Sequence, residues 1–225
     1  MHRVAILQSN YLPWKGYFRI IDSVDHFLFY DDVQYTKNDW RNRNKIIING
    51  DLKWLTIPVG PSSKLLIDEV LLPNGGWREE HLRKIVQAYR YTDNFSKVYE
   101  FISRILTDEN ILTLSDLNQT IIQRISIEWL KIETYFDSSK RHALLTTKSE
   151  RVLELCKNVN ATHYLSGPAA QSYLKVDDFM AEGITVEWMD YEVFGKYNQK
   201  SDTFQHSVSI IDVLFNVGFQ AKLYI

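Results

Sequence analysis

The sequence predicts an α/β protein with a mainly parallel sheet, flanking helices, a β-hairpin and an inserted helical lobe. Short apolar runs typical of buried strands alternate with amphipathic helical segments at both ends of the 225-residue chain. An Asn-Gly pair at 49–50 separates two β-rich runs. Residues 77–145 show helical periodicity. We expect residues 1–225 to form a single α/β domain, with the helical insertion around 77–145.

The N-terminal segment predicts a strand, a helix and a second strand. Residues 3–7 form a short apolar run, residues 26–32 predict a buried strand that ends in two carboxylates, and residues 16–24 carry apolar side chains at helical spacing. Strands joined in this way normally pair in parallel through a right-handed crossover. Ligands of such sheets bind beyond the carboxyl ends of the strands. We therefore expect a crevice lined by Gln8, Asn10, Tyr11, Asp31 and Asp32.

The middle of the chain predicts a hairpin followed by helices. Two β-rich runs flank Asn49-Gly50-Asp51, and Asn-Gly tolerates the positive φ angles of a tight primed turn. Residues 62–75 are irregular. Three segments within 77–145 then carry apolar residues at three- and four-residue spacing. These helices form the predicted lobe between two parts of the sheet.

The last third returns to the α/β pattern. Residues 148–159 predict a helix, 161–167 a strand, and 183–191 a further strand. Pro168 suits the first position of a helix, which we expect to end near Glu182. A closing helix is expected over about 207–216, followed by Gly218.

Composition excludes several classes of protein. Hydrophobic residues make up 45% and charged residues 24%, as in ordinary globular proteins. No apolar stretch reaches the roughly 20 residues of a membrane span, and the N-terminus lacks a signal-peptide core. The single Cys156 excludes an internal disulfide. These features predict a cytoplasmic protein. The net charge of −2 predicts that the protein does not bind nucleic acid.

Asp31 and Asp32 are the candidate catalytic residues. Paired carboxylates at the end of a strand are a common position for a general base or a metal ligand. Adjacent residues of a strand face opposite sides, so only one enters the crevice unless the strand has already ended. The alternative is a solvated strand end beside a helix cap.

Arg41 and Arg43 are a candidate anion site. They lie on one face of an extended segment, and two guanidinium groups match a phosphate or a carboxylate. Asn44 adds hydrogen-bonding capacity. The alternative is a hairpin surface with solvated charges.

Ser166 and Gly167 form a second candidate wall of the crevice. They precede Pro168 at a strand-to-helix turn, where a hydroxyl and free backbone N–H groups can bind an anion. Helix capping alone is the alternative. The turn lacks the spacing of a serine-hydrolase nucleophile elbow.

Other common sites are absent from the sequence. The six histidines are scattered without metal-ligand spacing, so no metal site is predicted. Cys156 is expected to be a small buried side chain. Neither a G-x-G-x-x-G motif nor a Walker loop is present. The sequence therefore assigns no cofactor.

Blocks of residues along nearly the whole chain resemble those of the WbqC-like family, bacterial proteins usually encoded with surface-polysaccharide genes. The blocks are Gln8, Leu12-Pro13-x-x-Gly16-Tyr17-Phe18, Tyr30-Asp31-Asp32, Trp40-x-x-Arg43-Asn44, Tyr164-Leu165-Ser166-Gly167, Tyr173-Leu174, Tyr197-x-Gln199 and Ser209-Ile210-x-Asp212-x-Leu214-Phe215-Asn216-x-Gly218. The usual opening of the family reads Gln-Pro, where this chain has Gln8-Ser9.

The resemblance implies a role in O-antigen or related lipopolysaccharide assembly. The implied reaction places an acyl or aminoacyl group, such as glycine, on an amino sugar that is expected to be nucleotide-linked. The donor is left open between CoA, a carrier protein and an ATP-activated amino acid. A non-catalytic module that binds a nucleotide-sugar or a partner enzyme is the alternative.

This implied role gives each candidate residue a task. Asp31 or Asp32 takes the proton of the attacking amine. Arg41 and Arg43 hold a pyrophosphate, and backbone N–H groups near Gly167 stabilise the oxyanion. The remaining expected substrate contacts are Gln8, Asn10, Tyr11, Trp14, Gly16, Tyr17, Asn44, Ser166, Tyr173, Tyr197 and Gln199.

The opening stretch also resembles the entry of nucleotidylyltransferase-like folds, some of which activate a carboxylate with ATP. Trp14 and Tyr17 stand where those proteins carry the two histidines of a His-x-Gly-His signature. Adenylate chemistry would therefore lack its usual charge stabilisers here.

Overall fold

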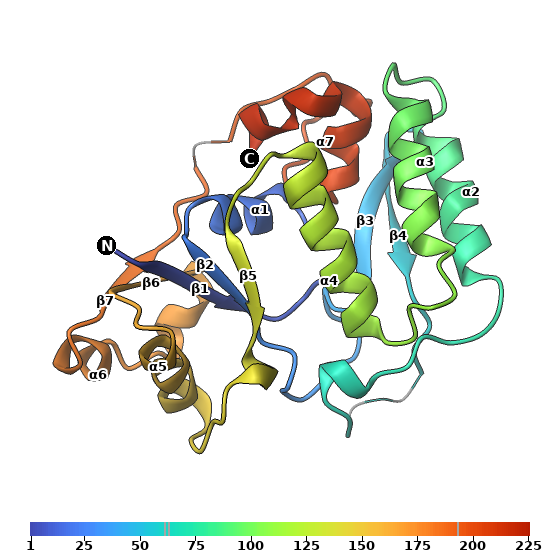
Figure 1. Cartoon of the computed structure of the whole chain (residues 1–225). Coiled ribbons are helices and arrows are strands. Elements are labelled where there is room, and N and C mark those ends of the chain that lie inside the picture. The colour runs from blue at the N-terminus through green and yellow to red at the C-terminus, as the bar shows by residue number, and fades with distance from the viewer. Residues whose placement is uncertain (61, 63, 193) are drawn as a thin grey trace.

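Five parallel strands form the central sheet of the computed structural model, in the order β5-β2-β1-β6-β7 (Figure 1). The structure describes residues 1–60, 62, 64–192 and 194–225. The strands of this sheet are β1 (Arg3–Leu7), β2 (His26–Phe29), β5 (Tyr135–Ser138), β6 (His163–Ser166) and β7 (Thr185–Trp188). The predicted α/β class with a mainly parallel sheet is confirmed.

The strand order reverses at the centre of the sheet. From β1 the chain moves through β2 to β5 at one edge, and then returns to β6 and β7 on the other side of β1. In open α/β sheets, ligands bind beyond the strand carboxyl ends at such a switch point. The segments that follow β1 and β6 therefore have the best-placed side chains for a site.

Alternating strand side chains divide the apolar core into two clusters. Ala5 and Phe27 belong to the cluster that holds α1 (Lys15–Asp22) and α7 (Ile210–Val217). Val4 and Leu28 belong to the cluster that holds α5 (Lys148–Asn158) and α6 (Val176–Ala181). Helices thus cover both faces, which explains why the central strands are almost continuously apolar.

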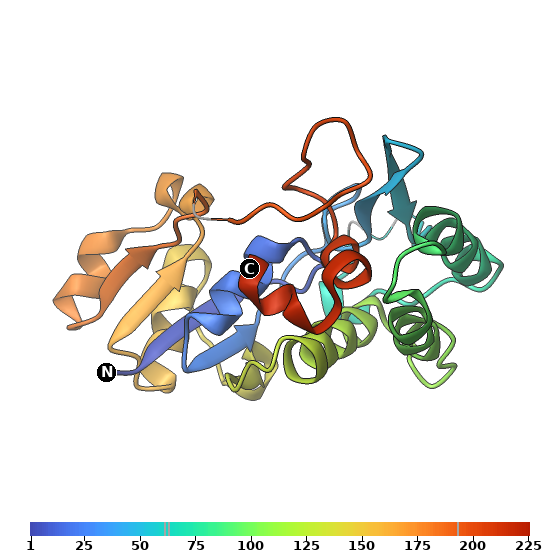
Figure 2. The ribbon, with the colours of Figure 1, turned by 90° about the horizontal axis from the view of Figure 1, so that it is seen from above.

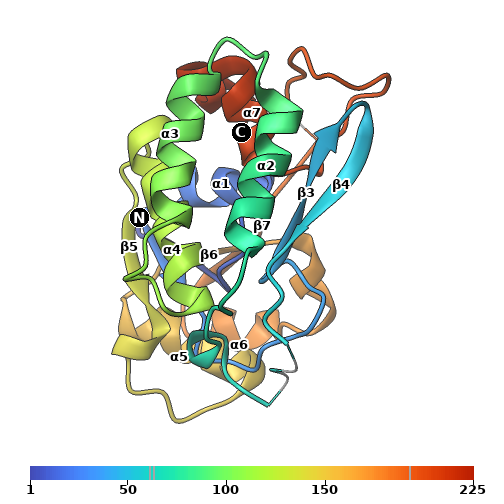
Figure 3. The same cartoon turned by 90° about the vertical axis from the view of Figure 1, so that its right-hand side faces the viewer.

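A hairpin and three helices form the lobe on the right of Figure 1. The hairpin pairs β3 (Arg43–Ile48) with β4 (Asp51–Thr56). Its turn has φ angles of 53° at Asn49 and 84° at Gly50, as predicted for a primed turn. Helices α2 (Trp77–Tyr89), α3 (Phe95–Leu106) and α4 (Leu114–Arg124) complete the lobe, and a π-helical turn (Ile125–Trp129) extends α4. Figure 3 shows α2 beside the hairpin and α3 next to α2.

The connection between β7 and α7 runs across the molecule from the sheet to the hairpin (Figure 2). Its end is anchored by the backbone N–H of Ser209, which donates to the carbonyl of Lys45 at 2.9 Å. Trp14 and Ser209 also form an isolated antiparallel bridge. The predicted closing helix is confirmed as α7, and Gly218 ends it with a φ of 59°.

Three boundaries differ from the prediction. The helical block does not continue to residue 145, because the chain after Trp129 forms strand β5 at the edge of the sheet. The second strand ends at Phe29, so the two carboxylates at 31 and 32 follow it. The helix expected from Pro168 to Glu182 is a 3₁₀ turn (Pro168–Ser172) and the separate helix α6.

A closing 3₁₀ segment (Gly218–Tyr224) and shorter 3₁₀ turns at Ile67–Glu69 and Ser139–Arg141 complete the elements. None of the helices in the described ranges combines the length and the apolar character that crossing a membrane requires.

Candidate functional site

A cavity of about 670 Å³ lies beyond the carboxyl ends of the central strands. Gln8 and Asn10 line it from the loop after β1, Tyr30 from the end of β2, and Gly167 from the end of β6. We call it the larger cavity. Its position is the one that the strand order predicts, at the switch point between β1 and β6.

The lining of the larger cavity is cationic and aromatic. Arg41 and Lys148 are its charged residues within the described part of the chain, which contributes neither Asp nor Glu to the lining. The aromatic lining residues are Trp14, Tyr17, Tyr30, Trp40, Tyr164, Tyr173 and Tyr191. Such a surface suits an anionic ligand that also presents rings for stacking.

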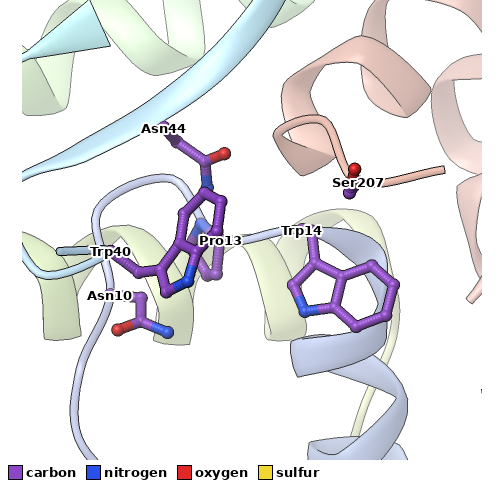
Figure 4. Close-up of a pocket in the computed structure, with 6 residues that line it drawn as sticks. All are labelled: Asn10, Pro13, Trp14, Trp40, Asn44 and Ser207. Carbon is purple, nitrogen blue, oxygen red and sulfur yellow. The ribbon is translucent and has the colours of Figure 1, made fainter. Parts of the chain in front are cut away.

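A smaller cavity of about 300 Å³ adjoins it. Asn10, Trp14 and Trp40 line both cavities. Pro13, Asn44 and Ser207 complete the smaller cavity's lining, and Figure 4 shows the two indole rings at its opposite sides. The shared residues make the two cavities parts of one site.

The loop between β1 and α1 is held in a constrained conformation. Leu12 is fully buried and has a φ of 43°, which is uncommon for a residue other than glycine. The Asn44 side chain donates to the carbonyls of Tyr11 at 3.3 Å and Leu12 at 2.8 Å. Asn44 therefore fixes the backbone of this loop as well as lining the smaller cavity.

Tyr11 lies outside both linings, in the core of the lobe. Its hydroxyl donates to Nδ1 of His81 at 2.9 Å, and Nε2 of His81 lies 3.2 Å from the carbonyl of Thr56. Burial lowers the pKa of His81 to about 4. A neutral His81 that donates from Nε2 and accepts at Nδ1 satisfies both contacts.

Gly16 supports the site through its neighbour. A Cβ atom at Gly16 would lie 2.2 Å from Cζ2 of Trp14, so the indole ring rests directly on this glycine. The ring also contacts Tyr191, with centroids 4.9 Å apart, and Phe194 at 5.6 Å. The glycine at position 16 therefore allows Trp14 to occupy the junction of the two cavities.

Asp31 is buried and its carboxylate accepts three hydrogen bonds. The donors are the backbone N–H of Ser9 at 2.7 Å, the hydroxyl of Ser115 and the amide of Gln119 at 2.9 Å. These contacts tie the loop after β1 to α4. Asp31 does not line either cavity.

Asp32 also contacts protein groups. Its carboxylate accepts from the hydroxyl of Ser139 and forms an ion pair with Arg151. The guanidinium of Arg151 lies 5.6 Å from the ring centroid of Tyr30, which lines the larger cavity. The catalytic role of the two carboxylates stays a prediction, and their contacts favour positioning roles.

The two predicted anion-binding arginines have different environments. Arg41 lines the larger cavity, with Nη1 3.2 Å from Oδ2 of Asp39. Arg43 stacks on Trp54, its guanidinium carbon 4.4 Å from the ring centroid, and does not line the cavity. Burial and the charge of Asp39 raise the pKa of Tyr35, and the charges of Arg43 and Arg41 oppose that rise.

The turn after β6 contributes Gly167 rather than Ser166. Ser166 is buried and accepts a hydrogen bond from the Tyr164 hydroxyl at 3.3 Å. Gly167 and the exposed Tyr173 line the larger cavity, as does Tyr17. The Tyr17 hydroxyl donates to the carbonyl of Gln8 at 3.0 Å, and burial raises its pKa well above the usual value.

Tyr197 and Gln199 lie away from both linings. The carboxylate of Asp212 accepts from the Tyr197 hydroxyl at 2.6 Å, the Gln199 amide at 2.7 Å and the Tyr89 hydroxyl at 3.0 Å. Burial raises the pKa of Asp212, and these donors lower it. This network fastens the β7–α7 connection to α7 and α2.

Lys15 is a buried cation beside the site. Its Nζ donates to the carbonyl of Gly195 at 3.1 Å and lies 4.8 Å from the ring centroid of Phe194 and 5.3 Å from that of Phe204. Burial lowers its pKa to about 8. Lys15 thereby holds the β7–α7 connection against the start of α1.

Sequence reasoning did not assign Trp40, Lys148, Tyr30 or Tyr191 to the site. Trp40 directly precedes the predicted anion-binding Arg41, and Tyr30 directly follows β2, so the positions of both in the sequence indicate that they lie near the site. Lys148 and Tyr191 reach the cavity from distant segments through the tertiary fold. Across the described ranges, no three His, Cys, Asp or Glu side chains converge as a metal site.

Comparison with known proteins agrees with the sequence motifs. The model of the WbqC-like protein family matches residues 8–224. The chain belongs to this family. It is also 40% identical over 227 residues to the uncharacterized protein Rv1507c of Mycobacterium tuberculosis (strain ATCC 25618 / H37Rv), covering 100% of this chain and 98% of that protein. No solved structure matches this WbqC-like protein significantly.

Proposed function

We propose that this WbqC-like protein is a transferase of glycan biosynthesis that places an acyl or aminoacyl group on a nucleotide-linked amino sugar. The observation that carries the proposal is the larger cavity at the switch point of the sheet. It combines Arg41, Lys148 and several aromatic rings, with no carboxylate among its described lining residues. Family membership agrees with the proposal without naming a reaction.

The charge of the cavity supports a phosphorylated ligand. A nucleoside diphosphate carries several anionic oxygens, and a guanidinium group can donate two hydrogen bonds to them. Lys148 is exposed at the start of α5 and supplies a second positive charge. A carboxylate in the lining would oppose such a ligand.

The aromatic residues supply surfaces for a base or a sugar ring. Trp14 and Tyr191 contact each other beside Gly167, and Tyr173 is 65% exposed at the cavity. Stacking of a planar base on such rings adds affinity without demanding a particular hydrogen-bond pattern. The cavity can thus hold the nucleotide while the sugar extends beyond the phosphates.

In the proposed reaction the sugar amine attacks the carbonyl carbon of an activated acyl group. A C–N bond forms, the bond to the donor's leaving group breaks, and an amine proton is released. Backbone N–H groups near Gly167 are the proposed stabilisers of the developing oxyanion. Asp31 positions the loop that carries Asn10, and Asp32 positions Arg151.

The competing function is a non-catalytic module that binds the same nucleotide-sugar. The observation that favours it is the absence of Asp31 and Asp32 from the described cavity lining. A binding module needs the cavity and its cations but no proton acceptor. The two functions therefore predict the same ligand binding and different outcomes for turnover.

The experiment combines a binding assay with product detection. The purified protein is mixed with UDP- and dTDP-linked amino sugars, together with acetyl-CoA or with ATP and glycine, and the sugars are analysed by mass spectrometry. The proposal predicts a thermal shift with a nucleotide-linked amino sugar and the mass gain of an acylated product. Binding without a mass gain favours the module.

Two variants make this experiment specific. Arg41→Ala should weaken nucleotide-sugar binding by roughly 10- to 100-fold, since a charge-assisted contact is lost. Arg83→Ala removes an exposed arginine of α2 that lines neither cavity and should leave binding unchanged. Equal binding by the two variants would contradict the assignment of the cavity.

A further inference from the structure

The smaller cavity differs chemically from the larger one. Its described lining contains no charged side chain, and it presents the indole rings of Trp14 and Trp40 with the polar groups of Asn10, Asn44 and Ser207. Indole faces pack against the C–H faces of a pyranose, and amides and hydroxyls bond to its polar substituents. The lining therefore suits a neutral polar ring better than a phosphate.

Asn10 lines both cavities, and its side chain carries an acceptor without a partner. Its Oδ1 is buried and has no hydrogen-bond partner in the structure. By contrast, the amide of Asn44 already donates to the loop carbonyls of Tyr11 and Leu12. A buried acceptor without a donor is costly, and an N–H or O–H group of a ligand would satisfy it.

The two cavities together match a ligand with one charged part and one neutral part. Asn10, Trp14 and Trp40 line both cavities, so a molecule that occupies the larger cavity can extend past them into the smaller one. Arg41 lies in the lining of the larger cavity and not of the smaller one. A nucleotide-linked sugar has such parts, because its charged phosphates are directly followed by its neutral pyranose ring.

We propose that the smaller cavity is the sugar subsite, where Oδ1 of Asn10 accepts a hydrogen bond from the amine of the amino sugar. The pyranose lies between Trp14 and Trp40, and the diphosphate lies at Arg41 in the larger cavity. This inference rests on the proposed function and adds the residue that recognises the reacting amine.

An amide acceptor at this position has a chemical consequence. A carboxylate next to the amine would favour the charged ammonium form, which cannot attack a carbonyl. The amide oxygen of Asn10 orients the N–H without adding a negative charge. The amine nitrogen then bonds to the acyl carbon of an activated carboxylic acid, the leaving group departs with its electron pair, and one amine proton passes to solvent.

The test uses small probes that separate the two cavities. Binding of methyl glucosaminide, methyl glucoside and UDP is measured by saturation-transfer NMR on the full chain. We expect methyl glucosaminide to bind, with Asn10→Ala weakening it about fivefold to tenfold and Trp40→Ala abolishing it. Arg41→Ala should weaken UDP and leave methyl glucosaminide unchanged.

Matched controls keep the result interpretable. Asn158→Ala changes an exposed asparagine at the end of α5 that lines neither cavity, and should bind both probes normally. Asn10→Asp should bind methyl glucosaminide more tightly than methyl glucoside and slow acyl transfer, because its carboxylate favours the ammonium form. Faster acyl transfer by Asn10→Asp would overturn the inference.

The outcomes distinguish this subsite from the proposed function. Glucosaminide binding that is insensitive to both Asn10→Ala and Trp40→Ala overturns the subsite, even when UDP binds at Arg41. Failure of UDP to bind, with glucosaminide binding that depends on Asn10, supports the subsite and counts against the nucleotide-linked substrate. Failure of both probes overturns both proposals.

Discussion

Replacing Gly16 by Ala tests how the opening loop builds the site. In a helix this substitution ordinarily stabilises, by about 0.5–1 kcal/mol. Here the added Cβ would lie 2.2 Å from Cζ2 and 2.5 Å from Cη2 of Trp14, whereas ordinary van der Waals contact begins at 3.4 Å. The indole ring must therefore move away from its present position.

The size of the effect follows from these opposing terms. Forcing extra atoms into a packed region costs typically about 1–3 kcal/mol, which exceeds the gain in helix propensity. We expect a net loss of about 1 kcal/mol, or a decrease in Tm of about 2–4 °C for a protein of this length. Because Trp14 lines both cavities, ligand affinity should fall more than stability does.

The assay measures thermal unfolding and binding of an amino-sugar ligand for Gly16→Ala beside Gly76→Ala. Gly76 is the matched control, because its Cβ would meet only Oε2 of Glu79 at 3.8 Å. Gly76 is also the N-cap residue of α2, where alanine is less favoured than glycine, so the control should lose up to about 1 kcal/mol of stability and keep its affinity. A Gly16→Ala protein as stable as the wild type, with unchanged affinity, would refute the role assigned to this glycine.

Three further substitutions test individual contacts. Lys15→Met should stabilise the protein at pH 7, because the lowering of the lysine's pKa from 10.5 to about 8 by burial corresponds to about 3 kcal/mol. Between pH 8 and 10.5 the unfolded state binds more protons than the folded state, so the stability of the wild type rises with pH in this range. The stability advantage of Lys15→Met therefore shrinks from pH 8 to 10.5, which urea unfolding at several pH values measures. A stability difference that stays constant with pH contradicts the burial of the charge. Asp31→Ala should lower the free energy of unfolding in urea by about 2–4 kcal/mol, because the groups that donate to this carboxylate are left unpaired. An equal loss in Asp31→Asn, which keeps one acceptor oxygen, would count against the stabilising role of these hydrogen bonds. Gly50→Ala should lower the free energy of unfolding by about 1–2 kcal/mol, because the φ of this residue is 84°. A steric clash does not contribute, since nothing lies within 4 Å of the added Cβ. An unchanged Tm would contradict the turn assignment.

The fold was predictable where local signals were strong. The apolar runs at 3–7 and 26–29 and the Asn49-Gly50 turn form the predicted elements, because burial on both faces and positive φ leave clear marks on the sequence. Strand β5 was missed for the opposite reason. It has four residues at the sheet edge, and Tyr135 is 59% exposed, so it shows no apolar run.

The site was predictable only in part. Gln8, Asn10 and Gly167 line the larger cavity because strand ends converge at the switch point of a parallel sheet. The burial of Asp31 under Ser115 and Gln119 depends on a helix more than 80 positions further along the chain. No local pattern encodes such a contact.

The network around Asp212 illustrates the same limit. Tyr197 and Gln199 are spaced two apart, which is compatible with one face of an extended segment in a crevice. In the structure both donate to Asp212, a carboxylate buried in α7. Their importance to the protein is visible in the sequence motif, while their structural role requires the tertiary contact.

Whether a nucleotide-linked amino sugar binds in the two cavities is tested most directly by the NMR spectrum of the indole N–H groups during its titration. The chain has six tryptophans, so the signals can be assigned by single substitutions. We expect the signals of Trp14 and Trp40 to shift, since both residues line the two cavities, while those of the buried Trp77 and Trp129 stay unchanged. Saturable binding that leaves the signals of Trp14 and Trp40 unchanged would show that the ligand site lies elsewhere.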